Sequence, residues 1–397
     1  MSQVKRIAII GAGVAGMSLA ILAAEKGFQV ELYERQSDIS SMGAGVTLWP
    51  NAIWVLDKMG LKERAIAVGG QPRFMRQFDV SGRQISELDI EAVNRISSLT
   101  SVTILRRDLM TLLAQRLAEK NIRIQFDTAM DADDIHSLKQ KADLVVAADG
   151  RMNSVGRRML FADDAEPQYQ GFINLIGISP LDDGSSAAKC LSTSIQDYRG
   201  EQERFGIVPV SDGLCYWAAA WPDTGGSPEE MRQRSLSVNA WRHQLYKRFG
   251  HWPEPVAQTI RDYAPASLKA IFVHDLNPLP RWHQDNLLLL GDSAHAPLPT
   301  SGQGACQALE DAWHLVDVLT GEQISIGEPC SLENRLSMFY QRRIGKTTLC
   351  QNIGRQVAQG IFKTAGVKAS AGAPLTESGP VVISPQQLND LWMKGLE

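Results

Sequence analysis

The sequence predicts an α/β fold, in which a doubly wound domain carries an inserted, mainly antiparallel β-sheet domain and ends in C-terminal helices. An apolar run, a glycine-rich turn and a helical pattern open the chain, and buried-strand patterns return after residue 100 and after residue 275. Alternating apolar and polar residues fill the stretches between. We therefore expect one domain from residues 1–72, 100–169 and 275–365, a second from 73–99 and 170–274, and a tail over 366–397.

The first strand, residues 7–10, leads into a glycine-rich turn and a helix through residue 23. Glycines in this context let the backbone approach a pyrophosphate at the helix N-terminus. A second strand over 29–33 ends at Glu34, which is placed to accept hydrogen bonds from ribose hydroxyls, and Arg35 follows as a contact to the adenine or as a solvated side chain. These patterns predict a dinucleotide site that includes Gly11, Gly13, Ala15, Gly16, Glu34 and Arg35.

The later elements follow from period and turn residues. We expect a helix over 51–58 that ends at Gly60, a hairpin within 73–99 across Ser81-Gly82, and strands over 102–105, 122–126 and 144–148 that flank a helix over 108–120. A second hairpin is predicted over 204–221 and a helical stretch over 228–249. A strand over 287–290 then precedes helices over 304–319 and 332–362, and residues 385–396 can form a short docked helix.

A second glycine-rich segment follows the strand over 287–290. It reads Gly291-Asp292-Ser-Ala-His295-Ala-Pro297-Leu-Pro299-Thr-Ser-Gly302-Gln-Gly304. This segment resembles the flavin-contacting motif of class A flavoprotein monooxygenases, the para-hydroxybenzoate hydroxylase-like family. Further blocks that match the family in order are 43–52, 105–109 and 142–151, so the resemblance extends from residue 4 to about 315.

The resemblance implies an FAD-binding domain of the GR2-type Rossmann fold. Asp292 would accept hydrogen bonds from the ribityl chain, and Arg106, or alternatively Arg107, would reach the pyrophosphate. The Asp149-Gly150 pair is associated in the family with both FAD and nicotinamide nucleotide, but Gly156-Arg157 stands here in place of the family's usual arginine. The remaining flavin contacts implied are Gly45, Val46, Pro299, Gly302, Gly304 and Ala305, of which the last three would bring free backbone N–H donors to the pyrimidine edge of the flavin. The family uses the His295 position structurally.

In this family NAD(P)H reduces FAD, O₂ adds at flavin C4a, and the hydroperoxide attacks an electron-rich carbon of the substrate. The substrate would lie against the 204–221 hairpin. If residues 211–213 form a three-residue loop, Arg204 and Tyr216 share one face with small residues between them, which suits a planar, acidic heteroaromatic. The segment resembles that of urate hydroxylases, and salicylate and hydroxynicotinate hydroxylases have comparable hairpins. Packing of both side chains within the sheet is the alternative.

We therefore predict an enzyme, an FAD-dependent NAD(P)H monooxygenase that hydroxylates a small aromatic or heteroaromatic compound, with Arg204 and Tyr216 as candidate catalytic residues. One alternative is a related epoxidase or hydroxylase of a hydrophobic polycycle. A non-catalytic flavin-binding protein that sequesters an intermediate is another. A flavin halogenase is disfavoured because no Trp-x-Trp-x-Ile-Pro segment occurs.

The composition and charge of the chain disfavour several classes of partner and cofactor. A net charge of -4, a pI near 6.0 and the lack of a basic run argue against nucleic acid, and no apolar run is long enough to span a membrane. The 5 cysteines include no Cys-x-x-Cys pair, which argues for reduced thiols and against a flavin disulfide reductase. The 7 histidines lack metal-ligand spacing, so no metal is predicted. We expect a cytoplasmic monomer or homodimer without a leader.

Overall fold

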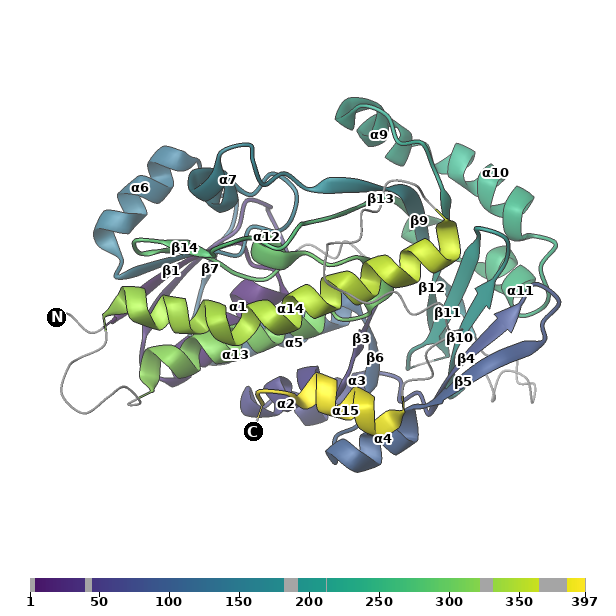
Figure 1. Cartoon of the computed structure of the whole chain (residues 1–397), viewed down its shortest axis with the longest axis horizontal. Helices are drawn as coiled ribbons and strands as arrows, with labels where there is room; N and C mark the ends of the chain where they lie inside the picture. The colour runs from purple at the N-terminus through teal and green to yellow at the C-terminus, as the bar shows by residue number, and fades with distance from the viewer. Residues whose placement is uncertain are drawn as a thin grey trace.

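The computed structural model describes residues 4–39, 45–181, 192–211, 213–321, 331–363 and 384–396. Its strands form two large sheets that lie toward opposite ends of the molecule (Figure 1). The long helix α14 (Leu332–Phe362) runs beside both of them. In the described part of the chain, no helix combines the length and the apolar character needed to cross a bilayer.

The first sheet has six strands in the order β14-β15-β8-β1-β2-β7. Every neighbouring pair is parallel except β14 and β15. Its central strands are apolar along their length because helices cover both faces of a doubly wound sheet. The strands are β1 (Arg6–Ile10), β2 (Gln29–Tyr33), β7 (Ile124–Gln125), β8 (Leu144–Ala147), β14 (His283–Gln284) and β15 (Leu287–Leu289).

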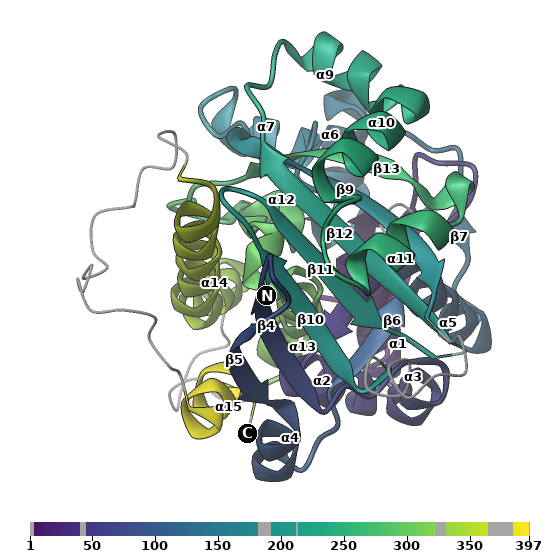
Figure 2. The ribbon, with the colours of Figure 1, turned by 90° about the vertical axis from the view of Figure 1, so that its right-hand side faces the viewer.

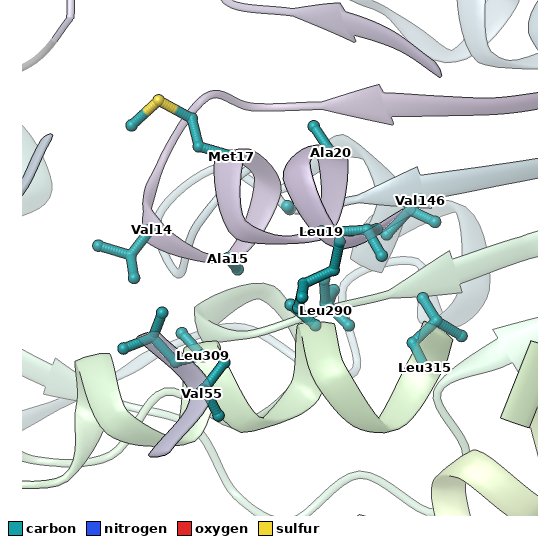
Figure 3. Packing of buried hydrophobic residues seen from close by; sticks show 14 of the residues in the cluster. Val14, Ala15, Met17, Leu19, Ala20, Val55, Val146, Leu290, Leu309 and Leu315 are labelled. Atoms are coloured by element: carbon teal, nitrogen blue, oxygen red, sulfur yellow. The ribbon is translucent and has the colours of Figure 1, made fainter. Parts of the chain in front are cut away.

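The helices around this sheet build the main core. Residues 14–23 of α1 (Val14–Glu25) are all buried, because this apolar helix lies between the sheet and α13 (Gly304–Thr320). Leu290, Leu309 and Leu315 pack beneath it (Figure 3). The other helices of this part are α2 (Pro50–Lys58), α3 (Lys62–Val68), α5 (Arg106–Glu119), α6 (Ala132–Lys141), α7 (Val155–Phe161) and α12 (Asp292–His295).

The second sheet has seven strands in the order β13-β9-β12-β11-β10-β4-β5, and only β4 and β10 pair in parallel. Helices α10 (Val238–Phe249) and α11 (Val256–Asp262) cover one face (Figure 2), with α9 (Pro228–Ser235) beside them. The strands are β4 (Phe74–Asp79), β5 (Gln84–Asp89), β9 (Gln168–Pro180), β10 (Ser194–Arg199), β11 (Arg204–Pro209), β12 (Leu214–Pro222) and β13 (Lys269–Asp275).

Smaller elements join the two sheets. The antiparallel pair of β3 (Gly45–Leu48) and β6 (Val102–Leu105) lies between them. The helix predicted near the C-terminus is α15 (Pro385–Met393), which docks against α2 and α4 (Ile90–Ser97). Short 3₁₀ turns, η1 (Pro265–Ser267) and η2 (Pro299–Ser301), complete the fold. Residues 366–383 of the predicted tail lie outside the described residues.

Several elements differ from the sequence expectation. The predicted 73–99 hairpin ends at Asp89, and helix α4 follows it directly. Asp89 is the N-cap of this helix, because its side chain accepts a hydrogen bond from Ala92 N. The helical stretch over 228–249 is two helices, because α9 ends before Ser237. Helix α6 was not predicted: its sequence is strongly polar, and a capping box between Asp131 and Asp134 marks its start. The domain boundaries themselves stay a prediction.

Candidate cofactor and substrate site

Gly11, in the turn after β1, and Gly16, in the first turn of α1, occupy positions where the side chain can be only a hydrogen atom. Gly11 has a φ of 102°, and a Cβ there would lie 2.4 Å from Ala148 O. A Cβ on Gly16 would lie 1.9 Å from Gly11 O. Gly13 differs, because no described atom lies within 4 Å of where its Cβ would stand. This open position at the N-terminus of α1 is where a phosphate can approach the backbone.

Glu34 is fixed against this turn. Its Oε2 accepts a hydrogen bond from Ala12 N at 2.8 Å, and its Oε1 accepts one from Gln36 N at 2.9 Å. Each carboxylate oxygen retains a second lone pair for a ribose hydroxyl. Arg35 is exposed, and no hydrogen bond from its side chain to another described residue is found.

Asp292 and Arg106 come together from distant parts of the chain. Gly291, which precedes Asp292, packs so close to Ala15 that a Cβ on it would lie 2.9 Å from Ala15 Cβ. Burial lowers the pKa of the Arg106 guanidinium, while the charge of Asp292 raises it. Arg106 Nε is buried without a hydrogen-bond partner among the described residues. A desolvated cation with an unused donor is suited to an anionic ligand.

Arg107 and Asp149 are placed differently from that pair. Arg107 is exposed and contacts Asp108, with Nε at 3.4 Å from Oδ1, whereas Arg106 is half-buried and its Nε is fully covered. Ser154 is the N-cap of helix α7, and Asp149 binds the same helix start: its carboxylate accepts hydrogen bonds from Ser154 Oγ at 2.6 Å and Val155 N at 2.7 Å. Burial raises the pKa of Asp149 although these hydrogen bonds lower it. The observed contacts of Asp149 therefore stabilise the N-terminus of α7.

Gly156 and Arg157, where the sequence departs from the family pattern, both make close contacts within the protein. A Cβ on Gly156 would lie 2.2 Å from Ala147 Cβ, so α7 packs directly on β8. Arg157 is 1% exposed and donates to Ser293 O at 3.1 Å and to Arg151 O at 2.5 Å. It thus ties the loop after β8 to helix α12.

Free backbone donors lie at the N-terminus of α13, directly after the loop that contains Gly302. Gly302 N–H is not one of them, contrary to the sequence expectation, because it donates to Pro299 O at 3.0 Å within η2. The N–H groups of Gly304 and Ala305, in the first turn of α13, have no partner among the described residues. Both residues are half-buried, and Pro299 and Gly302 are exposed. Two backbone donors and the positive end of a 17-residue helix therefore face outward here.

His295 has a structural position. It is 3% exposed, and its Nε2 lies 2.6 Å from Asp311 Oδ2. Asp311 also bonds Arg343 Nε at 2.7 Å and accepts a hydrogen bond from Gly291 N at 2.9 Å. The charges and hydrogen bonds of His295 and Arg343 hold the pKa of Asp311 at about 2 despite its burial. This buried cluster fixes the turn that carries Asp292.

Trp49 connects the C-terminal helix α15 to the loop before α13. The indole rings of Trp49 and Trp392 stack with centroids 4.4 Å apart, and Trp49 Nε1 donates to Gly302 O at 3.1 Å. Lys346 Nζ donates to Trp392 O at 2.5 Å and to Glu310 Oε2 at 2.9 Å. No local sequence pattern links α15 to this loop, since the contact joins residues at opposite ends of the chain.

We call the first sheet, the helices around it and the β3–β6 pair the cofactor-binding part. Strand β3 brings this part against the second sheet, where Gly45 approaches Tyr216 of β12. A Cβ on Gly45 would lie 2.1 Å from the Tyr216 ring, so only glycine allows this approach. Tyr216 Oη and Thr47 Oγ1 lie 3.2 Å apart. Val46, the other predicted contact of this strand, is half-buried, and Gly45 pairs with Leu105, the residue before Arg106. The part of the predicted loop that includes Gly43 lies outside the described residues.

The predicted hairpin register is confirmed. Arg204 pairs with Ala220, Gly206 with Ala218 and Val208 with Tyr216. The loop also closes as expected, because Val210 N donates to Leu214 O at 2.8 Å, although Asp212 lies outside the described residues. Arg204 and Tyr216 therefore stand on one face, about two pairs of residues apart, with a floor of small residues between them.

Both ends of this floor are polar. Arg204 Nε donates to Asp197 Oδ1 at 2.5 Å, and its side chain is 24% exposed. Burial raises the pKa of the Tyr216 phenol to about 12, although the hydrogen bond with Thr47 and the charge of Arg204 both lower it. The phenol is consequently neutral at physiological pH. A fixed cation and a neutral hydroxyl thus face each other across the floor.

Comparison with known proteins identifies the family of this chain and its cofactor. A family model described as an FAD binding domain matches residues 4–324. The chain belongs to this FAD-binding family. The FAD cofactor, the α/β fold and the resemblance to class A aromatic monooxygenases are confirmed by this match and by relatives across most of the chain.

Two relatives and one solved structure illustrate the likeness. FAD-dependent urate hydroxylase from Mycolicibacterium vanbaalenii is 28% identical over 319 residues, 77% of this chain and 78% of the relative. 6-hydroxynicotinate 3-monooxygenase from Bordetella bronchiseptica is 29% identical over 323 residues, 77% and 80% of the two chains. The crystal structure of Klebsiella pneumoniae HpxO complexed with FAD and uric acid shares the fold, with a TM-score of 0.76, 23% identity and coverage of 91% and 90%.

These similarities make the chain an enzyme, an FAD-dependent monooxygenase of the aromatic hydroxylase type. NAD(P)H as co-substrate is typical of its family. Its own residues also fit the cofactor: Gly13 leaves room for a phosphate, Arg106 has an unused buried donor, and the N–H groups of Gly304 and Ala305 are free.

Proposed function

We propose that this FAD-dependent enzyme hydroxylates a small, acidic aromatic or heteroaromatic compound at the hairpin face. In this reaction an aromatic C–H bond becomes C–OH: one atom of O₂ enters the product, the other leaves as water, and NAD(P)H supplies two electrons. Bound FAD supplies the chemistry that joins these half-reactions. The observation that carries the proposal is the face itself, where Arg204 and Tyr216 bracket Gly206 and Ala218 beside Gly45 of the cofactor-binding part.

The proposed cofactor contacts divide by the part of FAD that each would hold. The open turn at Gly13 and the cation of Arg106 would hold the pyrophosphate, and Glu34 the adenosine ribose. Asp292 would accept hydrogen bonds from the ribityl hydroxyls. The remaining proposed contacts are Gly11, Ala15, Gly16, Arg35, Gly45, Val46, Asp149, Pro299, Gly302, Gly304 and Ala305.

The chain's own residues would bind and orient the substrate. Arg204 offers a positive charge to an anionic ring substituent, since only its Nε is used by Asp197. Tyr216 offers a neutral hydroxyl to a ring heteroatom or oxygen, because its pKa of about 12 keeps the proton on the phenol. Gly206 and Ala218 leave room for a flat ring between these two groups. The pair fixes which ring edge faces the flavin.

Oxygen-coupled turnover tests the proposal. NAD(P)H oxidation and peroxide release are measured for the purified enzyme with and without a panel of hydroxybenzoates, hydroxynicotinates and purines, and products are checked for an added oxygen atom. We expect at least one acidic aromatic to accelerate NAD(P)H oxidation while peroxide release falls, because oxygen is then transferred to the substrate. The proposal fails if every compound leaves both rates unchanged, or if only uncharged polycycles are hydroxylated.

A further inference from the structure

The substrate face carries a second arginine beside the first. Arg199, at the end of β10, pairs directly with Arg204 on β11, so both side chains stand on the same face. Their side chains are 32% and 24% exposed, whereas Asp197 between them is 1% exposed. Two partly accessible cations therefore flank one buried carboxylate.

Each oxygen of the Asp197 carboxylate binds one arginine, in both cases through the arginine Nε. Asp197 Oδ1 accepts a hydrogen bond from Arg204 Nε at 2.5 Å, and Oδ2 accepts one from Arg199 Nε at 3.0 Å. Neither guanidinium makes a further hydrogen bond or ion pair to another described residue. Each therefore keeps its terminal Nη donors free, and these are the groups that bind carboxylates in pairs.

Gly206 has no side chain, so the space beside Asp197 and Arg204 stays open. Gly206 pairs with Asp197, and Arg204 Nη2 lies 4.0 Å from where a Cβ of Gly206 would stand. The Arg204 guanidinium thus lies over the floor of small residues. The cluster has two positive charges and one negative charge, so it keeps a net charge of about +1 beside that floor.

We propose that Asp197 is a positioning residue that holds Arg199 and Arg204 side by side as one binding site for a ring carboxylate. This inference rests on the proposed function and narrows its substrate class to aromatic or heteroaromatic carboxylates. Arg199 and Arg204 share the carboxylate, and Tyr216 contacts the opposite ring edge. Asp197 touches no substrate and acts through the two cations.

Paired ligands test the proposal in the holoenzyme. Binding of 6-hydroxynicotinate and 6-hydroxynicotinamide, and of 4-hydroxybenzoate and 4-hydroxybenzamide, is titrated through the change in flavin absorbance. Each pair differs only in carboxylate against amide. We expect the wild-type enzyme to prefer one carboxylate over its amide by roughly tenfold or more, and Arg199→Gln to reduce that preference to about threefold or less. Arg232→Gln, which removes an arginine 70% exposed on helix α9, beside the helices that cover the other face of the sheet, is the control and should keep the preference.

Asp197→Asn separates positioning from simple charge. Removal of a negative charge makes the site more positive, so electrostatics alone predicts tighter carboxylate binding. Positioning predicts weaker carboxylate binding and a smaller preference over the amide, with FAD content retained. Tighter binding in Asp197→Asn would overturn the positioning role. If this variant does not fold, Arg199→Lys decides, because it keeps the charge but loses the Nε contact and should lose most of the preference.

The outcomes also separate this inference from the proposed function. If Arg204→Met abolishes the carboxylate preference while Arg199→Gln leaves it intact, the two-arginine site is wrong and the proposed function stands. If the wild-type enzyme binds the amides as tightly as the carboxylates but hydroxylates them, the carboxylate site is also overturned. If no aromatic of either kind binds or is turned over, both proposals fail.

Discussion

The two faces of the β11–β12 hairpin are built from alternate residues of the same strands, yet their side chains differ in size and polarity. Toward α10 and α11 the strands present large, buried side chains, such as Phe205, Trp217 and Trp221. Toward the cofactor-binding part they present Arg204, Gly206, Tyr216 and Ala218, which are small or polar. Because side chains alternate along a strand, one segment can supply both a core and a ligand surface.

The difference separates stability from function. The helix-covered face is a close-packed aromatic core, in which Trp217 Nε1 donates to Ser179 Oγ at 2.9 Å. The other face has one charged end, one hydroxyl end and few atoms between them. Substitutions on the first face should therefore change the free energy of unfolding, and substitutions on the second should change substrate kinetics.

Trp217→Ala should have the largest effect. The indole is fully buried against Phe205 and Tyr263, so its removal leaves a cavity and costs about 3–5 kcal/mol of stability. Chemical denaturation of the holoenzyme measures this. A loss below about 1 kcal/mol, or a loss confined to substrate kinetics, would break the distinction between the faces.

Two adjacent alanines provide a matched pair. Ala219→Leu adds atoms to the closed face, where overpacking should cost about 1–3 kcal/mol of stability. Ala218→Leu fills the floor opposite Gly206, so it should lower kcat/KM for the aromatic substrate by roughly tenfold or more while FAD content and thermal stability stay near wild type. Equal effects of the two variants on stability and on kcat/KM would show that the faces are not distinct.

The cofactor contacts extend the comparison. Asp292→Ala should weaken FAD retention by more than Glu34→Ala, because Asp292, whose charge acts on Arg106, would lie near the reactive ring whereas Glu34 would touch only the distant adenosine ribose. Each lost hydrogen bond to a carboxylate costs on the order of 1.5–3 kcal/mol. Flavin occupancy after dilution and gel filtration reports both. Unchanged occupancy in both variants would remove these residues from the cofactor site.

The smallest effect concerns pH. The folded pKa of Tyr216, about 12, lies above the value near 10 for an unfolded tyrosine, so the contribution of this neutral phenol to stability is present below about pH 10 and is lost as the pH rises toward 12. Wild-type enzyme should therefore lose stability faster than Tyr216→Phe over that interval. Parallel alkaline unfolding curves for the two proteins would contradict the buried, neutral phenol.

Local patterns made the cofactor-binding part predictable. The Gly11–Gly16 turn and Glu34 lie next to each other in a strand-turn-helix unit, and the Gly291–Gly304 segment carries its own family signature. The hairpin register also followed from one short loop. Each of these features depends on residues close in sequence.

The remaining features depend on contacts between distant segments. The role of Asp197 cannot be recognised in the sequence of β10, because it depends on the pairing of that strand with β11. The stacking of Trp392 on Trp49 likewise joins the C-terminal helix to the residue before α2. The predicted Gly302 donor was wrong because η2 uses that N–H internally, and a 3₁₀ turn after Pro299 has no strong signature in sequence.

The central claim is that Arg204 and Tyr216 bind substrate and do not merely pack the sheet. The most direct test compares Arg204→Met and Tyr216→Phe with wild type in three measurements: kcat/KM for an acidic aromatic, FAD content, and peroxide release without substrate. Arg204→Met leaves Asp197 paired with Arg199, so it creates no unpaired buried carboxylate. We predict a fall in kcat/KM of roughly 5- to 150-fold in each variant, with FAD content and peroxide release near wild type. Unchanged kcat/KM together with lower thermal stability would show that both side chains serve sheet packing and would contradict the account.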